Sequence, residues 1–429
     1  MHLSHSITAS STKDWVLECK LNARDDALAI ALSSSVIKFY DTSSLRQVGT
    51  TVTLAPSGKP SGSQRICATK WDVNSPFLYY VACGSSDSWD IGIGQSLAPR
   101  REAKVCSIDT RSGSVVSAWD FGALAREAGE LGAMEVSTSG TILCLGLGSE
   151  VLFFDVRGGR QAQGVGGGGS NSSNSNSSSS APPPPLLDRY SSHSDAVTSI
   201  VWHPTLARHT LSASEDGLIN VYDSGIAGEE DALVSTLSVG GSVSHFGVFG
   251  PSGALVHCAT RTGELSLWNI GGAEKLAEFG GLRGAGAGGS SVDSSGAGAG
   301  AVGGGLELDF LLSAHYHPSQ DILTAVAAGN SGVIHLLDVA LGRCGVRRVL
   351  RGGHDAPPRC AAMPQGDPGV LFSGGEDGRV CAWRDSPVGV GGRVRGREEE
   401  TGGCDVGTSE TSWSDEAAAF GKTKVPRKR

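Results

Sequence analysis

The chain has 429 residues, 62 of them glycine, which is about twice the usual share, and its net charge at pH 7 is −9. This acidic balance argues against nucleic acid or an anionic membrane as a general partner of the whole molecule. No run approaches the ~18 consecutive apolar residues of a membrane span, and the first residues do not have the pattern of a secretory signal. The ten cysteines are scattered without a C-x-x-C pair, so we expect a reduced, intracellular protein of the nucleus or cytoplasm, without metal or cofactor.

Short β-type runs recur along the chain, most of them ending in Asp or Asn, and they indicate an internal repeat. Their ends are separated by 68, 46, 68, 46, 69 and 46 residues, and the short interval is close to one repeat of ~40–45 residues. The seven runs are Val36–Asp41, Val105–Asp109, Val151–Asp155, Ile219–Asp223, Leu265–Asn269, Ile334–Asp338 and Val380–Arg384.

Three insertions account for the long intervals, at about residues 85–102, 161–185 and 279–305. The second and third are low-complexity segments rich in Gly and Ser, and such segments cannot bury enough apolar surface to offset the entropy of ordering them. We therefore expect disordered insertions within one domain over residues 1–385. A tail of Gly, Pro and charged residues follows over 386–429, and we expect it to be disordered as well.

Hairpin signals precede most of the repeated runs. Pairs such as Asp216-Gly217 and Asp377-Gly378 suit tight turns, because glycine accepts a positive φ. Another apolar run stands before each turn, so each repeat is predicted to be strand, hairpin, strand, with further strands around it. No segment carries a convincing helical period.

Two repeats carry a His, a Ser, an Asp and an aromatic residue at the same spacing of 19, 4 and 6 residues. This pattern resembles the WD40-repeat family, in which a loop His, a strand Ser or Thr, a turn Asp and a strand Trp form one buried hydrogen-bond network. The resemblance implies an all-β fold, a seven-bladed β-propeller, and gives these residues a structural role. The two sets are His193, Ser212, Asp216 and Tyr222, and His354, Ser373, Asp377 and Trp383.

The last repeat lacks an outer strand. In WD40 proteins the N-terminal segment usually supplies it, and here the candidate is the stretch from His5 to Ser10. We expect this strand to close the ring and to cover two sheet edges.

Ser, His and Asp together could also indicate a hydrolase. A nucleophile must be exposed beside an oxyanion hole, whereas this set occurs twice at equivalent repeat positions, as a scaffold element does. We therefore expect a non-enzymatic interaction scaffold that binds other proteins or peptides.

Two adjacent repeats end in Asp-x-Arg, with Asp109 and Arg111 in one and Asp155 and Arg157 in the next. They resemble the W-D-x-R boxes of substrate receptors for cullin-4 ubiquitin ligases, in which the Arg contacts the ligase adaptor protein. Both Trp positions differ, since Ile108 and Phe154 occupy them. The alternative is an ordinary strand-end Asp followed by a solvated Arg.

A basic cluster ends the chain, formed by Lys422, Lys424, Arg427, Lys428 and Arg429. It is a candidate nuclear import signal or RNA-contacting tail, and the latter would suit a nuclear RNA-associated assembly factor. The alternative is a solvated terminus. His315 and His317 could place two imidazoles on one strand face, but no third metal ligand is near in sequence, so we expect them to be structural or surface histidines.

Overall fold

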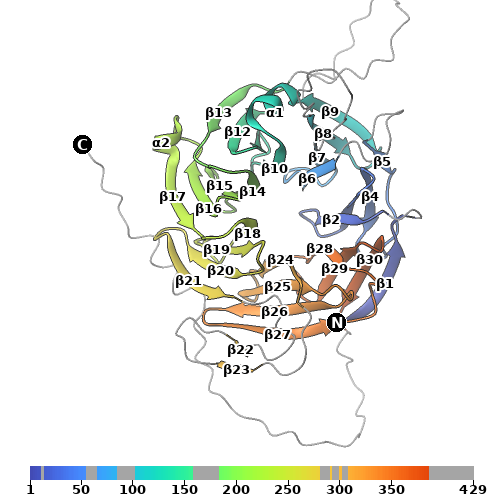
Figure 1. The fold of residues 1–429 in the computed structure, drawn as a ribbon. Helices are drawn as coiled ribbons and strands as arrows, with labels where there is room; N and C mark the ends of the chain where they lie inside the picture. The colour runs from blue at the N-terminus through green and yellow to red at the C-terminus, as the bar shows by residue number, and fades with distance from the viewer. Residues whose placement is uncertain are drawn as a thin grey trace, which may run out of the picture.

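The alternating runs of the sequence form strands, and the strands make seven four-stranded antiparallel sheets that stand as blades around an axis (Figure 1). The seven-bladed all-β fold expected from the repeat is thus confirmed. The structure is a computed structural model, and it describes residues 1–10, 14–54, 65–84, 102–157, 183–280 and 308–385, together with the backbone of two short strands between 290 and 301.

The blades are numbered along the chain, and each begins with the strand nearest the axis. Blade 1 contains β2 (Val16–Leu21), β3 (Ala27–Leu32), β4 (Val36–Asp41) and β5 (Val52–Thr53); blade 2 contains β6 (Arg65–Trp71), β7 (Leu78–Gly84), β8 (Ala103–Asp109) and β9 (Ser114–Asp120); blade 3 contains β10 (Leu131–Val136), β11 (Ile142–Leu147), β12 (Glu150–Asp155) and β13 (Leu186–Tyr190). Blade 4 contains β14 (Val197–Trp202), β15 (His209–Ser214), β16 (Leu218–Asp223) and β17 (Leu233–Ser238); blade 5 contains β18 (Val243–Phe249), β19 (Leu255–Thr260), β20 (Leu265–Asn269) and β21 (Glu274–Phe279). Blade 6 contains β24 (Phe310–His317), β25 (Ile322–Ala328), β26 (Ile334–Ala340) and β27 (Arg343–Leu350); blade 7 contains β28 (Pro358–Ala362), β29 (Val370–Gly375), β30 (Arg379–Arg384) and β1 (His2–Thr8).

Three smaller features lie between these strands. Two short helices, α1 (Gly122–Ala128) and α2 (Glu229–Ala232), were not predicted, because seven and four residues are too few to show a helical period. A pair of strands, β22 (Ser290–Ser291) and β23 (Ala299–Ala301), falls within the third insertion. The rest of the insertions and the tail, whose disorder the sequence predicts, lies almost entirely outside the described residues. Neither helix of the described part is long and apolar enough to cross a bilayer.

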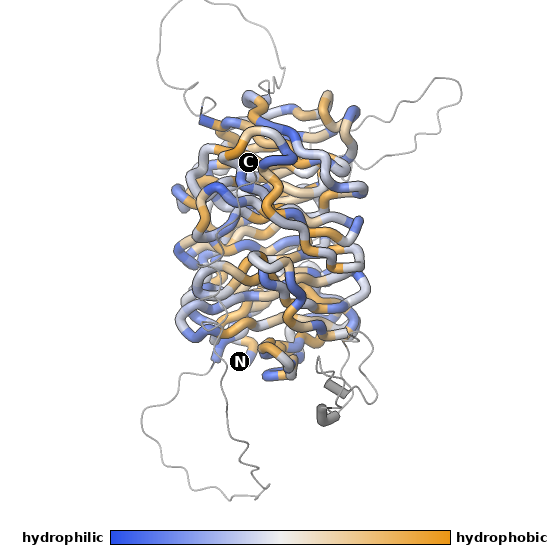
Figure 2. The backbone as a smooth tube through the Cα atoms, turned by 90° about the vertical axis from the view of Figure 1, so that its left-hand side faces the viewer, coloured by the Kyte–Doolittle hydropathy of each residue, from blue (hydrophilic) through white to orange (hydrophobic). Residues whose placement is uncertain are grey.

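Because successive strands of a blade are antiparallel, the connections fall on two opposite faces of the ring. The Asp–Arg face carries the connections between first and second and between third and fourth strands. The His face carries the tight turns between second and third strands and the links between blades. Viewed edge-on, apolar segments follow the strands and hydrophilic segments lie mostly at the turns (Figure 2).

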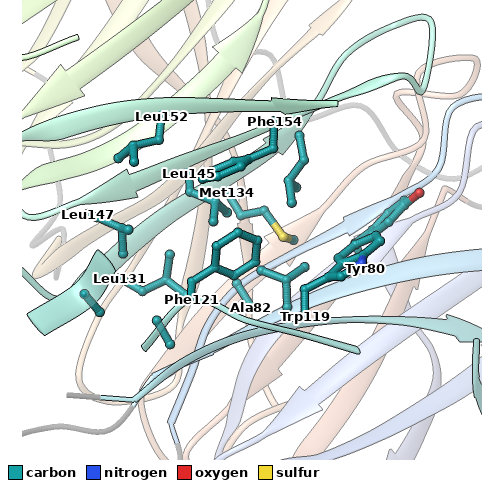
Figure 3. Packing of buried hydrophobic residues seen from close by; sticks show 14 of the residues in the cluster. Tyr80, Ala82, Trp119, Phe121, Leu131, Met134, Leu145, Leu147, Leu152 and Phe154 are labelled. Atoms are coloured by element: carbon teal, nitrogen blue, oxygen red, sulfur yellow. The ribbon is translucent and has the colours of Figure 1, made fainter. Parts of the chain in front are cut away.

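Apolar side chains hold neighbouring blades together. Between blades 2 and 3 the core includes Tyr80, Trp119, Phe121, Met134 and Phe154, all buried (Figure 3). The rings of Phe121 and Phe154 meet edge to face with centroids 4.9 Å apart. This packing fixes the position of the third strands β8 and β12, which carry the two Asp-x-Arg sequences.

Turn glycines allow the close approach of blades on the His face. Gly332 has φ +86°, and a Cβ there would lie 2.3 Å from the carbonyl oxygen of His354. A side chain at this position would clash with the loop that carries the buried histidine of blade 7.

Blade 7 is built from both ends of the described chain, with the order β1-β30-β29-β28. Closure by the N-terminal segment is confirmed, but the strand spans His2–Thr8 and not His5–Ser10. The shift has a packing reason: Leu3 contacts the core between blades 6 and 7, and Ile7 contacts the core between blades 7 and 1. A bulge between Leu3 and His5 brings both residues into place.

Closure gives the first prediction. Changing Leu3→Ser and Ile7→Ser together removes the partly buried apolar contacts of β1, so we expect the free energy of unfolding to fall by about 2 kcal/mol, roughly 1 per side chain. His5→Ser, at an exposed position of the same strand, should have almost no effect. Urea denaturation checks this, and equal stability of the double variant and the control would contradict the contribution of β1 to closure.

Candidate functional site

The first His network lies in blade 4 on the His face. His193 stands in the loop before β14, and its Nδ1 is 3.0 Å from Oδ2 of Asp216. Its Nε2 is 2.8 Å from the hydroxyl oxygen of Ser212 on β15. The backbone N–H groups of Ser194 and Leu218 also donate to the Asp216 carboxylate. The imidazole therefore ties a loop, a strand and a turn together.

The second network lies in blade 7 and includes the indole. His354 Nδ1 is 3.1 Å from Asp377 Oδ1, and His354 Nε2 is 2.8 Å from Ser373 Oγ. The Trp383 indole N–H donates to the same Ser373 oxygen at 2.9 Å. Burial alone would raise the pKa of Asp377, but hydrogen bonds from His354 and from backbone N–H groups outweigh it and lower that pKa.

The two networks differ at their aromatic ends. Among the described residues, the structure gives the Tyr222 hydroxyl no hydrogen bond to Ser212. The ring packs instead against Tyr190, with centroids 4.7 Å apart, and Asn220 Nδ2 lies 3.5 Å from His193 Nε2. Sequence spacing aligned Tyr222 with Trp383, but a phenol carries its polar atom at the tip of the ring, whereas the indole N–H lies closer to the backbone.

Both serines are fully buried. A substrate cannot reach a hydroxyl that lies inside a blade, and each hydroxyl is held by a histidine that bonds onward to a turn Asp. The arrangement therefore supports loops and strands, and it does not have the exposed nucleophile that acyl transfer needs.

The Asp–Arg face carries both Asp-x-Arg sequences at matching places, just after β8 and β12. In blade 2, Arg111 donates from Nε to Asp109 Oδ1 at 3.1 Å and from Nη2 to Asp109 Oδ2 at 2.8 Å. In blade 3, Arg157 donates from Nε to Asp155 at 2.9 Å, and its Nη2 contacts the same carboxylate. The hydrogen bonds from Arg157 lower the pKa of Asp155 to about 2, so this ion pair persists at neutral pH.

A surface cavity of about 310 Å³ adjoins the first of these pairs and reaches blade 3. Arg111 and Val156, from the two Asp-x-Arg sequences, both line it, together with Phe77, Val116 and Trp119. The guanidinium carbon of Arg111 lies 4.7 Å from the Phe77 ring centroid, and Phe77 and Val116 are exposed. No sequence motif links Phe77 or Val116 to Arg111, because Phe77 comes from the connection before β7 and Val116 from β9.

Histidines also gather between blades 5 and 6. His245 on β18 and His257 on β19 belong to paired strands, and β18 contacts β24, which carries His315. His315 Nε2 is 2.8 Å from Ser313 Oγ. His317 is buried. No group of three or more His, Cys, Asp or Glu in the described parts of the chain could hold a metal ion. The basic cluster Lys422 to Arg429 lies outside the described residues, and its role stays a prediction.

These histidines predict acid sensitivity. Burial lowers the pKa of His245 to about 4 and those of His257 and His315 to about 3, with smaller contributions from neighbouring Lys20 and imidazoles. The unfolded chain takes up protons near pH 6.5 while the folded chain does not, so stability should fall as pH drops from 6.5 toward 4. His257→Leu should reduce this slope by up to about 1.4 kcal/mol per pH unit, as pH-dependent urea denaturation can measure. The exposed His5→Gln should leave the slope unchanged, and an unchanged slope in His257→Leu would contradict the prediction.

The blade 7 network predicts unequal costs for two matched serine substitutions. Ser373→Ala leaves both His354 Nε2 and the Trp383 N–H without their partner, so it should cost about 2–3 kcal/mol. Ser212→Ala removes one partner from His193, near which Asn220 remains, and should cost about 1 kcal/mol. Thermal and urea denaturation of the two variants give the comparison, and equal costs would show that the indole bond adds nothing.

Comparisons with known proteins agree with the blades and His networks described above. The family model described as "WD domain, G-beta repeat" matches residues 185–223, which include β14, β15 and β16 of blade 4. The chain is similar to "WD repeat-containing protein GTS1" of Arabidopsis thaliana, with 23% identity over 393 residues, covering 89% of this chain and 84% of the relative.

It is also similar to "WD repeat-containing protein 89 homolog" of Dictyostelium discoideum, with 24% identity over 265 residues, covering 61% of this chain and 56% of the relative. The stretch from His193 to Asp223 and the Gly352-Gly353-His354 segment carry the same resemblance in the sequence. The match over residues 185–223 identifies a WD40 repeat in blade 4, and the seven blades and the repeated His–Ser–Asp networks agree with the similarity of the chain to WD-repeat proteins.

Proposed function

We propose that this chain is a non-catalytic scaffold that binds a protein partner on its Asp–Arg face, at the edge shared by blades 2 and 3. WD40 propellers typically serve as protein-interaction scaffolds. The observation that carries the choice of face is the cavity in which exposed Phe77 and Val116 stand beside Arg111. Exposed aromatic and aliphatic side chains next to an oriented guanidinium are typical of surfaces that contribute strongly to binding.

The two ion pairs make this edge suitable for a specific partner. Each guanidinium is already held in one orientation by its own Asp, so less side-chain entropy is lost when a partner binds. Each also keeps N–H donors that its Asp does not use, and these can bind carbonyl or carboxylate oxygens.

A cullin-4 ligase adaptor is the second candidate partner, favoured by the matching geometry of Arg111 and Arg157 on consecutive blades. The departures from the W-D-x-R box, Ile108 and Phe154, are both buried. They fill core positions, where apolar side chains pack as Trp would, so the replacements leave the guanidinium groups exposed. The alternative role in RNA-associated assembly depends on the basic cluster at Lys422–Arg429, and none of the described residues bears on it.

Affinity purification from cells tests both proposals. We expect wild type to capture a protein partner, and the adaptor if the second proposal holds, and the double variant Arg111→Asp, Arg157→Asp to lose it. Arg261→Asp is the matched control, because Arg261 is a similarly exposed, ion-paired arginine on the His face.

The outcomes separate the two proposals. A partner other than the adaptor that is lost only in the double variant would support the scaffold and reject the ligase receptor. Partners that bind wild type, double variant and control alike would reject the choice of face.

A further inference from the structure

A third guanidinium lies on the Asp–Arg face, in blade 4. Asp223 ends β16 at the place where Asp109 ends β8 and Asp155 ends β12, yet its own loop carries no Arg two residues later. Arg208, from the connection between β14 and β15, fills this place, with Nη2 3.1 Å from Asp223 Oδ2. Gly225 makes room for it, since a Cβ there would lie 2.7 Å from the guanidinium carbon. We call Arg111, Arg157 and Arg208 the arginine row.

Exposure gives the arginine row a common polarity. The side chains of Arg111, Arg157 and Arg208 are 65%, 69% and 66% exposed, whereas their partners Asp109, Asp155 and Asp223 are only 25%, 19% and 12% exposed. Each ion pair is therefore a dipole whose positive end points toward solvent. A docking molecule meets the guanidinium first, although each pair is neutral as a whole.

The opposite part of the same face does not share this polarity. In blade 6, Arg347 is 25% exposed and its partner Asp338 is 49% exposed. Between blades 6 and 7, Arg348 of β27 is 42% exposed, and its partner Asp385, which follows β30, is 49% exposed. The third strand of blade 1 ends at Asp41, whose carboxylate accepts hydrogen bonds from two serines. The third strand of blade 5 ends at the uncharged Asn269. At the ends of the third strands on the Asp–Arg face, ion pairs in which the cation is clearly more exposed than the anion thus occur, among the described residues, only in the three consecutive blades 2, 3 and 4.

We propose that the arginine row binds an acidic segment of a protein partner, with carboxylates on the three guanidinium groups and an apolar side chain in the cavity beside Phe77. This proposal rests on the proposed function and extends its site to blade 4. An Arg presents five N–H donors, and pairing with its own Asp, through two nitrogens in Arg111 and Arg157 and through one in Arg208, leaves the others for the incoming carboxylates. The whole chain is acidic, so binding depends on these local groups and should weaken with added salt.

A synthetic probe tests the acidic chemistry directly. A fluorescein-labelled 18-residue peptide of six Glu-Ser-Leu repeats is titrated with the full chain, and fluorescence anisotropy is followed at 50 and 300 mM NaCl. The matched probe replaces every Glu by Gln. We expect the Glu probe to bind at least tenfold more tightly than the Gln probe at low salt, and to lose most of this advantage at high salt.

Single substitutions then locate the binding. Arg208→Gln should weaken binding of the Glu probe about fivefold, as should Arg111→Gln and Arg157→Gln. Arg347→Gln is the matched control, since Arg347 also pairs with an Asp near the end of a third strand but lies outside the row, and it should leave binding unchanged. Circular dichroism and thermal unfolding of each variant show that the fold is intact.

Several outcomes would overturn the proposal. Equal binding of the Glu and Gln probes would show that the row does not select acidic segments. Equal losses in Arg208→Gln and Arg347→Gln would show that blade 4 has no special role. If Arg111→Gln and Arg157→Gln weaken binding while Arg208→Gln does not, the extension to blade 4 is wrong but the site of the proposed function stands. Loss of the cellular partner in the double Asp variant, with no binding of either probe, would likewise retain the proposed function and reject the acidic partner.

Discussion

Pairing between β1 and β30 is the contact on which the rest of this ring depends. Six blades are each made from a continuous part of the chain, but blade 7 takes three strands from residues 358–384 and its fourth from residues 2–8. The core between blades 7 and 1 combines Val16 and Leu28 with Phe372 and Val380, which are more than 340 residues apart in sequence. Without this closure, blade 7 would expose an unpaired strand edge.

The two faces of the ring differ in how their polar side chains are buried. On the His face, the buried networks around His193 and His354 hold loops against strands, and tight glycine turns allow the blades to approach. A fully bonded buried network stabilises one arrangement of these loops, because breaking any member leaves a polar group unpaired. On the Asp–Arg face the ion pairs are exposed, so they add little to stability and remain available to a partner.

The number of blades could be predicted from sequence spacing because the third strand of almost every blade ends in a polar residue. These residues mark each repeat even where an insertion lengthens it. Prediction from spacing failed where the position of a strand or side chain depends on contacts between distant segments. The closing strand begins at His2 because Leu3 and Ile7 reach two different cores, and nothing in residues 1–10 alone reveals those cores. Tyr222 aligned with Trp383 by spacing, yet the polar atoms of the two rings lie at different distances from the backbone. Phe77 and Arg208 could not be found from a motif, since each meets its neighbours only after the blade has folded.

Arg208 shows that side chains without a common sequence motif can occupy equivalent positions on the surface. Arg111 and Arg157 follow their Asp by two residues, whereas Arg208 precedes Asp223 by fifteen, yet all three guanidinium groups occupy corresponding places and have nearly equal exposure. The repeated feature is therefore an Asp at the end of the third strand with room beside it for a guanidinium group. The Arg can come from the connection after the third strand or from the connection between the first and second strands. Since the three places belong to three separate sheets, their mutual geometry is set by the packing between blades 2, 3 and 4. A partner that contacts all three guanidinium groups would therefore depend on how blades 2, 3 and 4 pack against one another.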